Sequence, residues 1–157
     1  MRLPTALFCT SIFLGPAAAQ PSKPGLSPCA LLTKAEVQEA VGAPVSEAAL
    51  NMTNKSVCDF KVGDAGSSVS IMLTAKGPAD SAAKTVAELK KRNISGEVVP
   101  GLGDSAYASS TGYGMQQLGA YKGSHQVIAT VLLIGSPEAK SKAVAQAVIR
   151  KALARVP

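Results

Sequence analysis

Two runs of alternating apolar and polar residues, joined by a short turn, constrain the fold of this chain more than any other feature. In residues 57–62, Cys58 and Phe60 share one face of an extended chain, and in residues 68–75 apolar side chains again occupy every second position. The sequence Gly63-Asp64-Ala65-Gly66 lies between the two runs. The pattern predicts an antiparallel β-hairpin with one face buried in a core.

Further strands are expected in the C-terminal half of the chain. Residues 106–109, 115–121 and 126–134 are separated by Gly112-Tyr113-Gly114 and Lys122-Gly123-Ser124, which are typical turn sequences. The segment 126–134 is apolar on nearly both faces, and this pattern predicts a strand at the centre of a sheet.

Three helices complete the expected elements. Thr33 and Glu36 have the spacing of a capping box, and Gly42 supplies the residue type that ends a helix most easily. Residues 78–92, which begin with proline, carry apolar residues at helical spacing. Ser136-Pro137 places a capping residue before proline and predicts a last helix that runs to about residue 155.

The expected order is α-β-β-α-β-β-β-α. Short connections between the strands favour antiparallel pairing, so we expect an α+β fold: a single antiparallel sheet of about five strands with helices packed on it. Residues 20–28 are rich in proline and serine and predict an extended leader. Residues 29–157 are expected to form one domain.

Residues 1–19 have the features of a secretory signal peptide. Arg2 precedes an apolar run from Leu3 to Leu14, and small residues follow as far as Ala19. The run is about a dozen residues long, whereas a bilayer span takes roughly 20. We therefore expect cleavage after Ala19, giving a periplasmic or secreted protein that does not span a membrane.

Cleavage there leaves Cys29 and Cys58 as the cysteines of the mature chain. An even pair in an oxidising compartment favours one disulfide bond. A redox-active pair is the alternative, although redox motifs usually keep their cysteines two residues apart. Cys9 does not have the setting of a lipid-anchor cysteine, because Phe8 precedes it and the apolar run continues past it. A soluble product is expected.

The chain is basic, with 16 Lys and Arg, 10 Asp and Glu, and a net charge of +6. The signal peptide carries one basic residue and no acidic one, so 15 basic and 10 acidic residues leave the mature chain at +5. Basic helix faces could contact anionic envelope polymers or lipid head groups. The alternative is a solvated face with cations near helix C-termini. The candidate anion-binding residues are Lys140, Lys142, Arg150 and Lys151.

The sequence offers little for catalysis. Its one histidine, His125, would have to act with Ser105 and Asp104 in a hydrolase, but the flanking glycines of a nucleophile elbow are missing. One histidine and two cysteines expected to be bridged do not supply the three or four ligands of a zinc site. We therefore expect no catalytic residues, no metal and no cofactor.

Aromatic residues are too few to favour ligands that are bound by stacking. The chain has no Trp, three Tyr and three Phe, and two of the Phe belong to the signal peptide. Surfaces for sugars and nucleic acids usually use exposed aromatic rings. The composition therefore does not favour sugar binding, and we expect no nucleic-acid partner.

One glycine-rich segment, residues 99–107, is the best candidate for a recognition loop. Two glycines flank a leucine, and Asp104 can cap its own turn before the next strand begins. Such a loop lets backbone N–H groups approach a ligand, while the alternative is a structural corner that feeds the sheet. The candidate residues are Pro100, Gly101, Leu102, Gly103, Asp104 and Tyr107.

Three short motifs in the chain resemble those of a family of small bacterial exported domains of unknown function, many of which are actinobacterial lipoproteins. The shared pattern is Cys-x-Leu-Leu-Thr before the first helix, a second cysteine two residues before an aromatic residue, and a Pro-Gly-Leu-Gly-Asp-x-Ala turn. These motifs fall at residues 29–33, 58–60 and 100–106. The resemblance implies an envelope-located, non-catalytic domain with a Cys29–Cys58 bridge. This chain lacks the lipid-anchor cysteine of the family.

These observations predict a soluble periplasmic or secreted binding or accessory domain without catalytic activity. Its partner would be an envelope protein or a small ligand. One alternative is a binder of anionic envelope polymers or anionic membrane surfaces that acts through the basic helices. A second alternative is a hydrolase that uses Asp104, His125 and Ser105.

Overall fold

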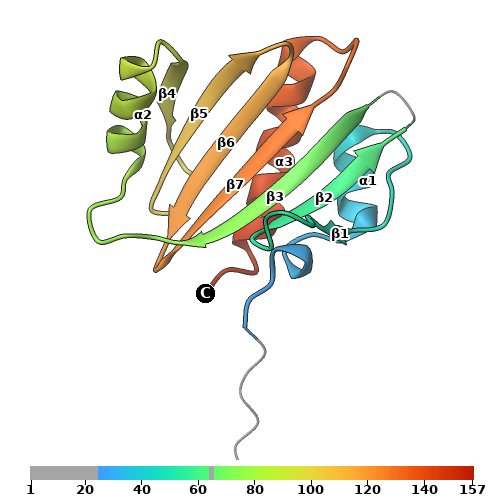
Figure 1. Cartoon of the computed structure of the whole chain (residues 1–157), viewed down its shortest axis with the longest axis horizontal. Coiled ribbons are helices and arrows are strands. Elements are labelled where there is room, and N and C mark those ends of the chain that lie inside the picture. The colour runs from blue at the N-terminus through green and yellow to red at the C-terminus, as the bar shows by residue number, and fades with distance from the viewer. Residues whose placement is uncertain (1–24, 64–65) are drawn as a thin grey trace, which may run out of the picture.

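A seven-stranded antiparallel sheet forms the centre of the protein (Figure 1). The computed structural model describes residues 25–63 and 66–157, so the expected signal peptide and residues 20–24 of the leader lie outside the described residues. The strand order is β1-β2-β3-β7-β6-β5-β4. The strands are β1 (Ala49–Leu50), β2 (Val57–Val62), β3 (Ser67–Ala75), β4 (Ser95–Val99), β5 (Ser105–Gly112), β6 (Met115–Lys122) and β7 (His125–Leu132).

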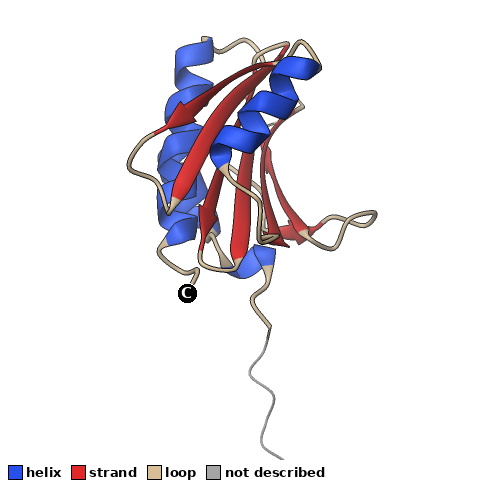
Figure 2. Ribbon diagram, turned by 90° about the vertical axis from the view of Figure 1, so that its left-hand side faces the viewer, coloured by secondary structure: helices blue, strands red, loops and turns tan. Residues whose placement is uncertain are grey.

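Helices lie on both faces of this sheet. They are the short 3-10 helix η1 (Pro28–Ala30), α1 (Lys34–Val41), α2 (Ala82–Lys91) and α3 (Glu138–Leu153). Figure 2 shows the sheet between α3 on one side and α2 on the other. In the described part of the chain, no helix is long and apolar enough to cross a membrane.

The expectation of an α+β fold with a single antiparallel sheet is confirmed, but the five-strand count and the element order were wrong. The structure adds β1 before the first hairpin and β4 after α2. β1 has only two residues, and β4 contains Gly96 and is largely exposed, so neither shows the alternation that marks a half-buried strand. The segment expected at 126–134 is β7, which occupies the centre of the sheet as predicted.

The local signals at α1 are confirmed. The Thr33 hydroxyl accepts a hydrogen bond from the Glu36 backbone N–H, and the Glu36 carboxylate accepts from the Thr33 backbone N–H. Gly42 follows the helix with a φ of 73°, a left-handed conformation that favours glycine.

The predicted starts of the other two helices were displaced. α2 begins at Ala82 rather than at Pro78, because the Asp80 carboxylate accepts from the Gly77 N–H in a preceding turn and the Ser81 hydroxyl caps the helix. α3 begins at Glu138 with Pro137 at its N-cap, so Ser136 does not serve as the cap.

The main core lies between the sheet and the helices α1 and α3. Phe60, Ile71 and Val127 from the strands and Ile149 from α3 are fully buried in it. A smaller cluster on the opposite face packs Ala82 and Val86 of α2 against Tyr107 and Tyr121, next to the partly buried Leu89. α2 therefore covers the side of the sheet formed by β4, β5 and β6.

The expected disulfide bond joins Cys29 to Cys58, with Cα atoms 5.1 Å apart. Cys58 is fully buried on the core face of β2, and Cys29 lies in η1. The bond therefore holds the start of the described chain against β2.

Candidate functional site

Among residues 25–63 and 66–157, no helix covers one face of the sheet over three of its strands. α1 and α3 lie behind the sheet, where α3 packs against β6 and β7 and α1 packs against β2, and α2 covers only the side formed by β4, β5 and β6 (Figure 1). We call the uncovered surface of β2, β3 and β7, together with the adjoining residues of β6, the open face. Its side chains are half-buried: on β3, for example, Ser68, Ser70 and Met72 alternate with fully buried apolar residues.

A row of polar side chains crosses the open face at right angles to the strands. The strand register places Asp59 opposite Ser70, Ser70 opposite Thr130, and Thr130 opposite Gln117. Residues paired across antiparallel strands point to the same face. We call these four residues, from β2, β3, β7 and β6, the polar stripe.

Hydrogen bonds connect members of the polar stripe. The Ser70 hydroxyl donates to Asp59 Oδ1 at 2.7 Å, and Gln117 Nε2 donates to Thr130 Oγ1 at 3.3 Å. Asp59 Oδ2 accepts from Asn51 Nδ2 at 2.8 Å, so both carboxylate oxygens already have partners. Ser109 of β5 continues the row under α2, where its hydroxyl is buried and has no hydrogen-bond partner in the described part of the chain.

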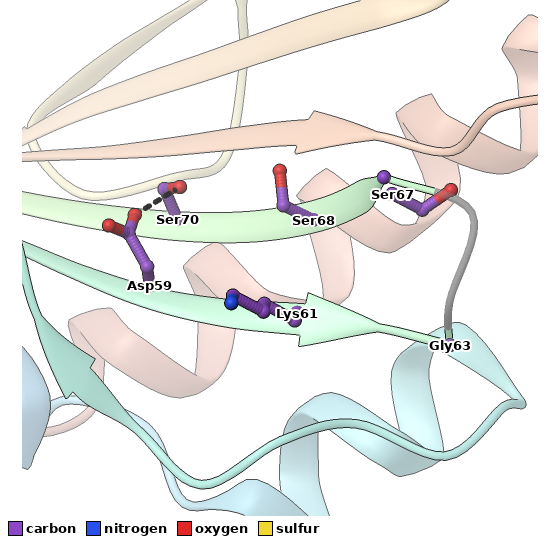
Figure 3. Close-up of a pocket in the computed structure, with 7 residues that line it drawn as sticks. Asp59, Lys61, Gly63, Ser67, Ser68 and Ser70 are labelled. Carbon is purple, nitrogen blue, oxygen red and sulfur yellow. Dashed lines mark hydrogen bonds between the residues drawn. The ribbon is translucent and has the colours of Figure 1, made fainter.

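A shallow hollow of about 630 Å³ lies at one end of the polar stripe. Figure 3 shows Asp59 and Lys61 on β2 facing Ser70 and Ser68 on β3, with the dashed Asp59–Ser70 hydrogen bond between them. Lys61 is exposed and forms no ion pair with the described residues. The hollow is lined by Asp59, Lys61, Gly63, Gly66, Ser67, Ser68 and Ser70.

Apolar side chains border the polar stripe on both sides. On one side, Met72 of β3 lies opposite Ile128 of β7. On the other side, Leu132 of β7 lies opposite Met115 of β6. All four are half-buried, so a ligand on the polar stripe would also contact aliphatic surface.

The segment expected to be a recognition loop forms a tightly held corner. Leu102 is buried in the main core, and Tyr107 is buried under α2. The Asp104 N–H donates to the Tyr121 carbonyl oxygen at 2.7 Å, and the Asp104 carboxylate accepts from the Gly123 N–H at 2.9 Å. Pro100, Gly101, Gly103 and Asp104 are exposed. The part of the loop that a partner could reach is therefore small.

The three groups of the hydrolase hypothesis have different hydrogen-bond partners. Asp104 binds the Gly123 N–H, Ser105 Oγ accepts from the Ala82 N–H at the start of α2, and His125 Nδ1 lies 3.3 Å from the Ser124 hydroxyl. None of these hydrogen bonds joins two members of the Asp104, Ser105 and His125 set.

Tyr107 does not supply an ionisable group at neutral pH. Burial, with a contribution from Tyr121, raises the pKa of Tyr107 to about 12, and the nearby Gln126 amide opposes this shift. The Tyr121 hydroxyl lies 2.7 Å from Thr85 Oγ1 and accepts from Gln126 Nε2 at 3.0 Å. The contact with Thr85 joins α2 to the sheet, and the hydrogen bond from Gln126 joins β7 to β6.

The four candidate anion-binding residues on α3 differ in their surroundings. Lys142 pairs with Glu97 of β4 at 2.7 Å, and Lys151 pairs with Glu39 of α1 at 2.8 Å. Lys140 and Arg150 are exposed and form no ion pair with the described residues. The carboxylates beside Lys142 and Lys151 reduce the net positive charge of this face.

Among residues 25–63 and 66–157, no three His, Cys, Asp or Glu side chains lie close enough to hold a metal ion.

Comparisons of the chain with protein-family models, curated proteins and solved structures found no match. The resemblance to small exported domains therefore stays a prediction.

The polar stripe was not predicted from the sequence. The polar residues of β2 and β3 could be recognised, because they alternate with the apolar residues that face the core. The alignment of Ser70 with Thr130, however, depends on pairing between strands about 60 residues apart, which no local pattern specifies.

Proposed function

We propose that this chain is an exported, non-catalytic binding or accessory domain that acts in the periplasm or outside the cell, after cleavage of a signal peptide at Ala19. The signal-like sequence of residues 1–19 and the Cys29–Cys58 disulfide support this location. Its partner is an envelope protein or a small ligand.

The observation that carries the proposal is the open face. Antiparallel sheets tolerate one solvated face, but that face usually carries strongly polar residues. Here half-buried aliphatic side chains lie beside the polar stripe and the hollow. A concave surface that mixes apolar area with a few oriented polar groups is typical of binding sites.

The alternative sites have less support. In the recognition-loop hypothesis for residues 100–107, two of the candidate side chains, Leu102 and Tyr107, are buried and cannot contact a partner. Binding of anionic polymers through α3 would depend mainly on Lys140 and Arg150, since the other two candidate cations have carboxylate partners. The hydrolase hypothesis would require Asp104 and Ser105 to give up their present hydrogen bonds.

A pair of matched variants tests the proposal. Ile128→Lys places a charge at the centre of the open face, whereas Val98→Lys places one on the exposed edge strand β4. We expect co-sedimentation of the protein with envelope fractions of its own cells to be lost in Ile128→Lys and retained in Val98→Lys. Circular dichroism melts establish that both variants fold.

Co-sedimentation of folded Ile128→Lys to the same extent as the wild type and Val98→Lys would contradict the proposal. Loss of an envelope-substrate hydrolysis activity in His125→Ala, with binding at the open face unaffected, would instead support the hydrolase alternative.

A further inference from the structure

The polar stripe has the chemistry of a surface that binds uncharged hydroxyl groups. It presents a serine and a threonine hydroxyl and a glutamine amide, all half-buried, and one carboxylate. Gln117 uses its amide N–H and Thr130 its oxygen in their mutual hydrogen bond, so the Gln117 carbonyl oxygen and the Thr130 hydroxyl proton have no partner among the described residues. These groups can therefore donate to and accept from a ligand.

The charges on the polar stripe do not favour strong binding of either a polyanion or a polycation. Asp59 is its one ionisable member, and both of its oxygens accept hydrogen bonds, from Ser70 and Asn51. The cation of Lys61 lies next to it in the hollow. A polyanion would find a single cation here, and a polycation would find a carboxylate whose oxygens are already occupied.

The spacing of the polar groups defines the shape of the ligand. Neighbouring strands lie about 4.8 Å apart, so the four residues of the polar stripe extend over roughly 14 Å. One strand spacing is close to the length of a pyranose ring along an extended glycan chain. A ligand that places hydroxyl groups at this interval would meet one polar side chain per unit.

The apolar borders fit the same ligand. The hydroxyl groups of a pyranose lie around the edge of the ring, and its two faces carry C–H groups, which pack against apolar surface rather than against hydrogen-bond donors. Met72 and Ile128 supply such surface on one side of the polar stripe, and Leu132 and Met115 on the other. The binding surface therefore does not need the exposed aromatic platforms that the composition lacks.

We propose that the polar stripe binds a neutral oligosaccharide chain lying across strands β2, β3, β7 and β6. This inference rests on the proposed binding function and names its ligand class. Thr130 of β7 and the neighbouring Gln117 of β6 contact the sugar hydroxyls directly.

The test uses residues 20–157 with the disulfide intact and three neutral tetrasaccharides: chitotetraose, cellotetraose and maltotetraose. NMR titration locates binding from the backbone amide shifts, and calorimetry measures the affinity. We expect at least one tetrasaccharide to shift amides of β3, β7 and β6 around the polar stripe. A tetragalacturonate and phosphatidylglycerol vesicles serve as anionic probes.

Matched double variants identify the residues. Thr130→Val with Gln117→Leu removes two polar groups of the polar stripe while keeping side-chain size. Thr111→Val with Gln146→Leu makes the same changes at the exposed end of β5 and on α3, outside the polar stripe. We expect the first pair to weaken tetrasaccharide binding about tenfold or more, the loss expected from one or two hydrogen bonds, and the second pair to leave it unchanged.

The outcomes separate this inference from the proposed function. If only an anionic probe shifts open-face amides, the neutral-glycan inference is overturned and the proposed binding face stands. If no tetrasaccharide binds, or if Thr130→Val with Gln117→Leu binds as well as the control pair, the inference is likewise overturned. If every probe that binds shifts amides elsewhere, such as along α3, both proposals fail.

Discussion

Gly103 occupies a position in the corner at residues 100–104 where only glycine fits. Its φ is 57°, and a Cβ there would overlap the Tyr121 carbonyl oxygen, which accepts the hydrogen bond from the Asp104 N–H. Gly101, two residues earlier, also has a positive φ of 75°, but nothing lies within 4 Å of its Cβ position. Substituting each glycine in turn therefore separates the energetic cost of a positive φ from the cost of steric overlap.

We predict that Gly103→Ala lowers the free energy of unfolding by about 2–4 kcal/mol, because the backbone must move away from Tyr121. Gly101→Ala should cost only about 1 kcal/mol, the usual penalty for a left-handed non-glycine residue. Urea unfolding of the two variants beside the wild type measures the difference. Equal losses would contradict the overlap at Gly103.

Glu36 links the capping box of α1 to the C-terminal end of the chain. Its carboxylate accepts from the Arg155 guanidinium at 3.0 Å and from the Thr33 backbone N–H at 2.8 Å. The hydrogen bond from Arg155 is the largest cause that lowers the pKa of Glu36 to about 2, with Thr33 adding to the shift and partial burial opposing it. The ionised form is therefore stabilised by folding.

A lowered folded-state pKa gives stability that is present above the unfolded-state pKa and lost as the pH falls. We predict that Glu36 contributes about 1–2 kcal/mol at neutral pH, allowing for solvent screening, and that this contribution disappears between about pH 5 and pH 2. The difference in unfolding free energy between wild type and Glu36→Gln, measured across this range, should shrink toward acid. A constant difference would refute the prediction.

At the scale of elements, the disulfide bond is the strongest constraint on the N-terminal part of the fold. It closes a loop with a sequence separation of 29 residues that contains α1 and β1. Restricting the unfolded chain in this way contributes about 3–4 kcal/mol in the chain-entropy model.

We predict that reduction lowers the melting temperature by roughly 10 °C, the shift expected for that loss in a domain of this size. Scanning calorimetry with and without reductant measures the change, and the Cys29→Ser variant should melt with the reduced protein. A melting temperature unchanged by reduction would contradict this role.

The end of α3 depends on a side chain from another element. Lys122 of β6 donates to the carbonyl oxygens of Leu153 at 2.9 Å and Val156 at 2.7 Å. A cation at a helix C-terminus satisfies free carbonyl groups and complements the helix dipole.

We predict that Lys122→Met destabilises the protein by about 1–2 kcal/mol and increases amide hydrogen exchange in the last turn of α3. Lys140→Met, at the exposed N-terminal end of the same helix, is the control and should leave both measurements nearly unchanged. Faster exchange in both variants would show that the effect does not come from the cap.

Sequence predicted the elements that are defined by local chemistry. The Thr33–Glu36 box, the left-handed Gly42 and the strands on both sides of the glycine turns were all visible in short segments. β4 was missed because it is an exposed edge strand whose partner, β5, defines it. The open face was missed for the same reason, since it depends on which strands become neighbours.

At the scale of the whole molecule, some basic side chains form ion pairs with carboxylates and others do not, so they contribute differently to the net positive charge of the surface. Lys142→Gln with Lys151→Gln and Lys140→Gln with Arg150→Gln lower the net charge equally. Only the second pair removes cations that have no carboxylate partner among the described residues.

We predict weak association with phosphatidylglycerol vesicles at low salt, which disappears at physiological ionic strength because exposed charges are then screened beyond about 8 Å. The Lys140→Gln and Arg150→Gln pair should reduce this association more than the Lys142→Gln and Lys151→Gln pair. Vesicle co-sedimentation measures both. Equal effects would show that net charge alone governs the contact.

The pairing of β3 with β7 has a consequence for how the chain assembles. β3 ends at Ala75, and the strand that completes its other edge begins at His125, after α2 and three further strands. If the chain folds as it emerges from its N-terminal end, the hairpin of β2 and β3 forms before β7 is available, with its inward side chains uncovered and one edge unpaired. The centre of the sheet is therefore the last part of it to close, and until then the early hairpin is open to pairing with the wrong strand.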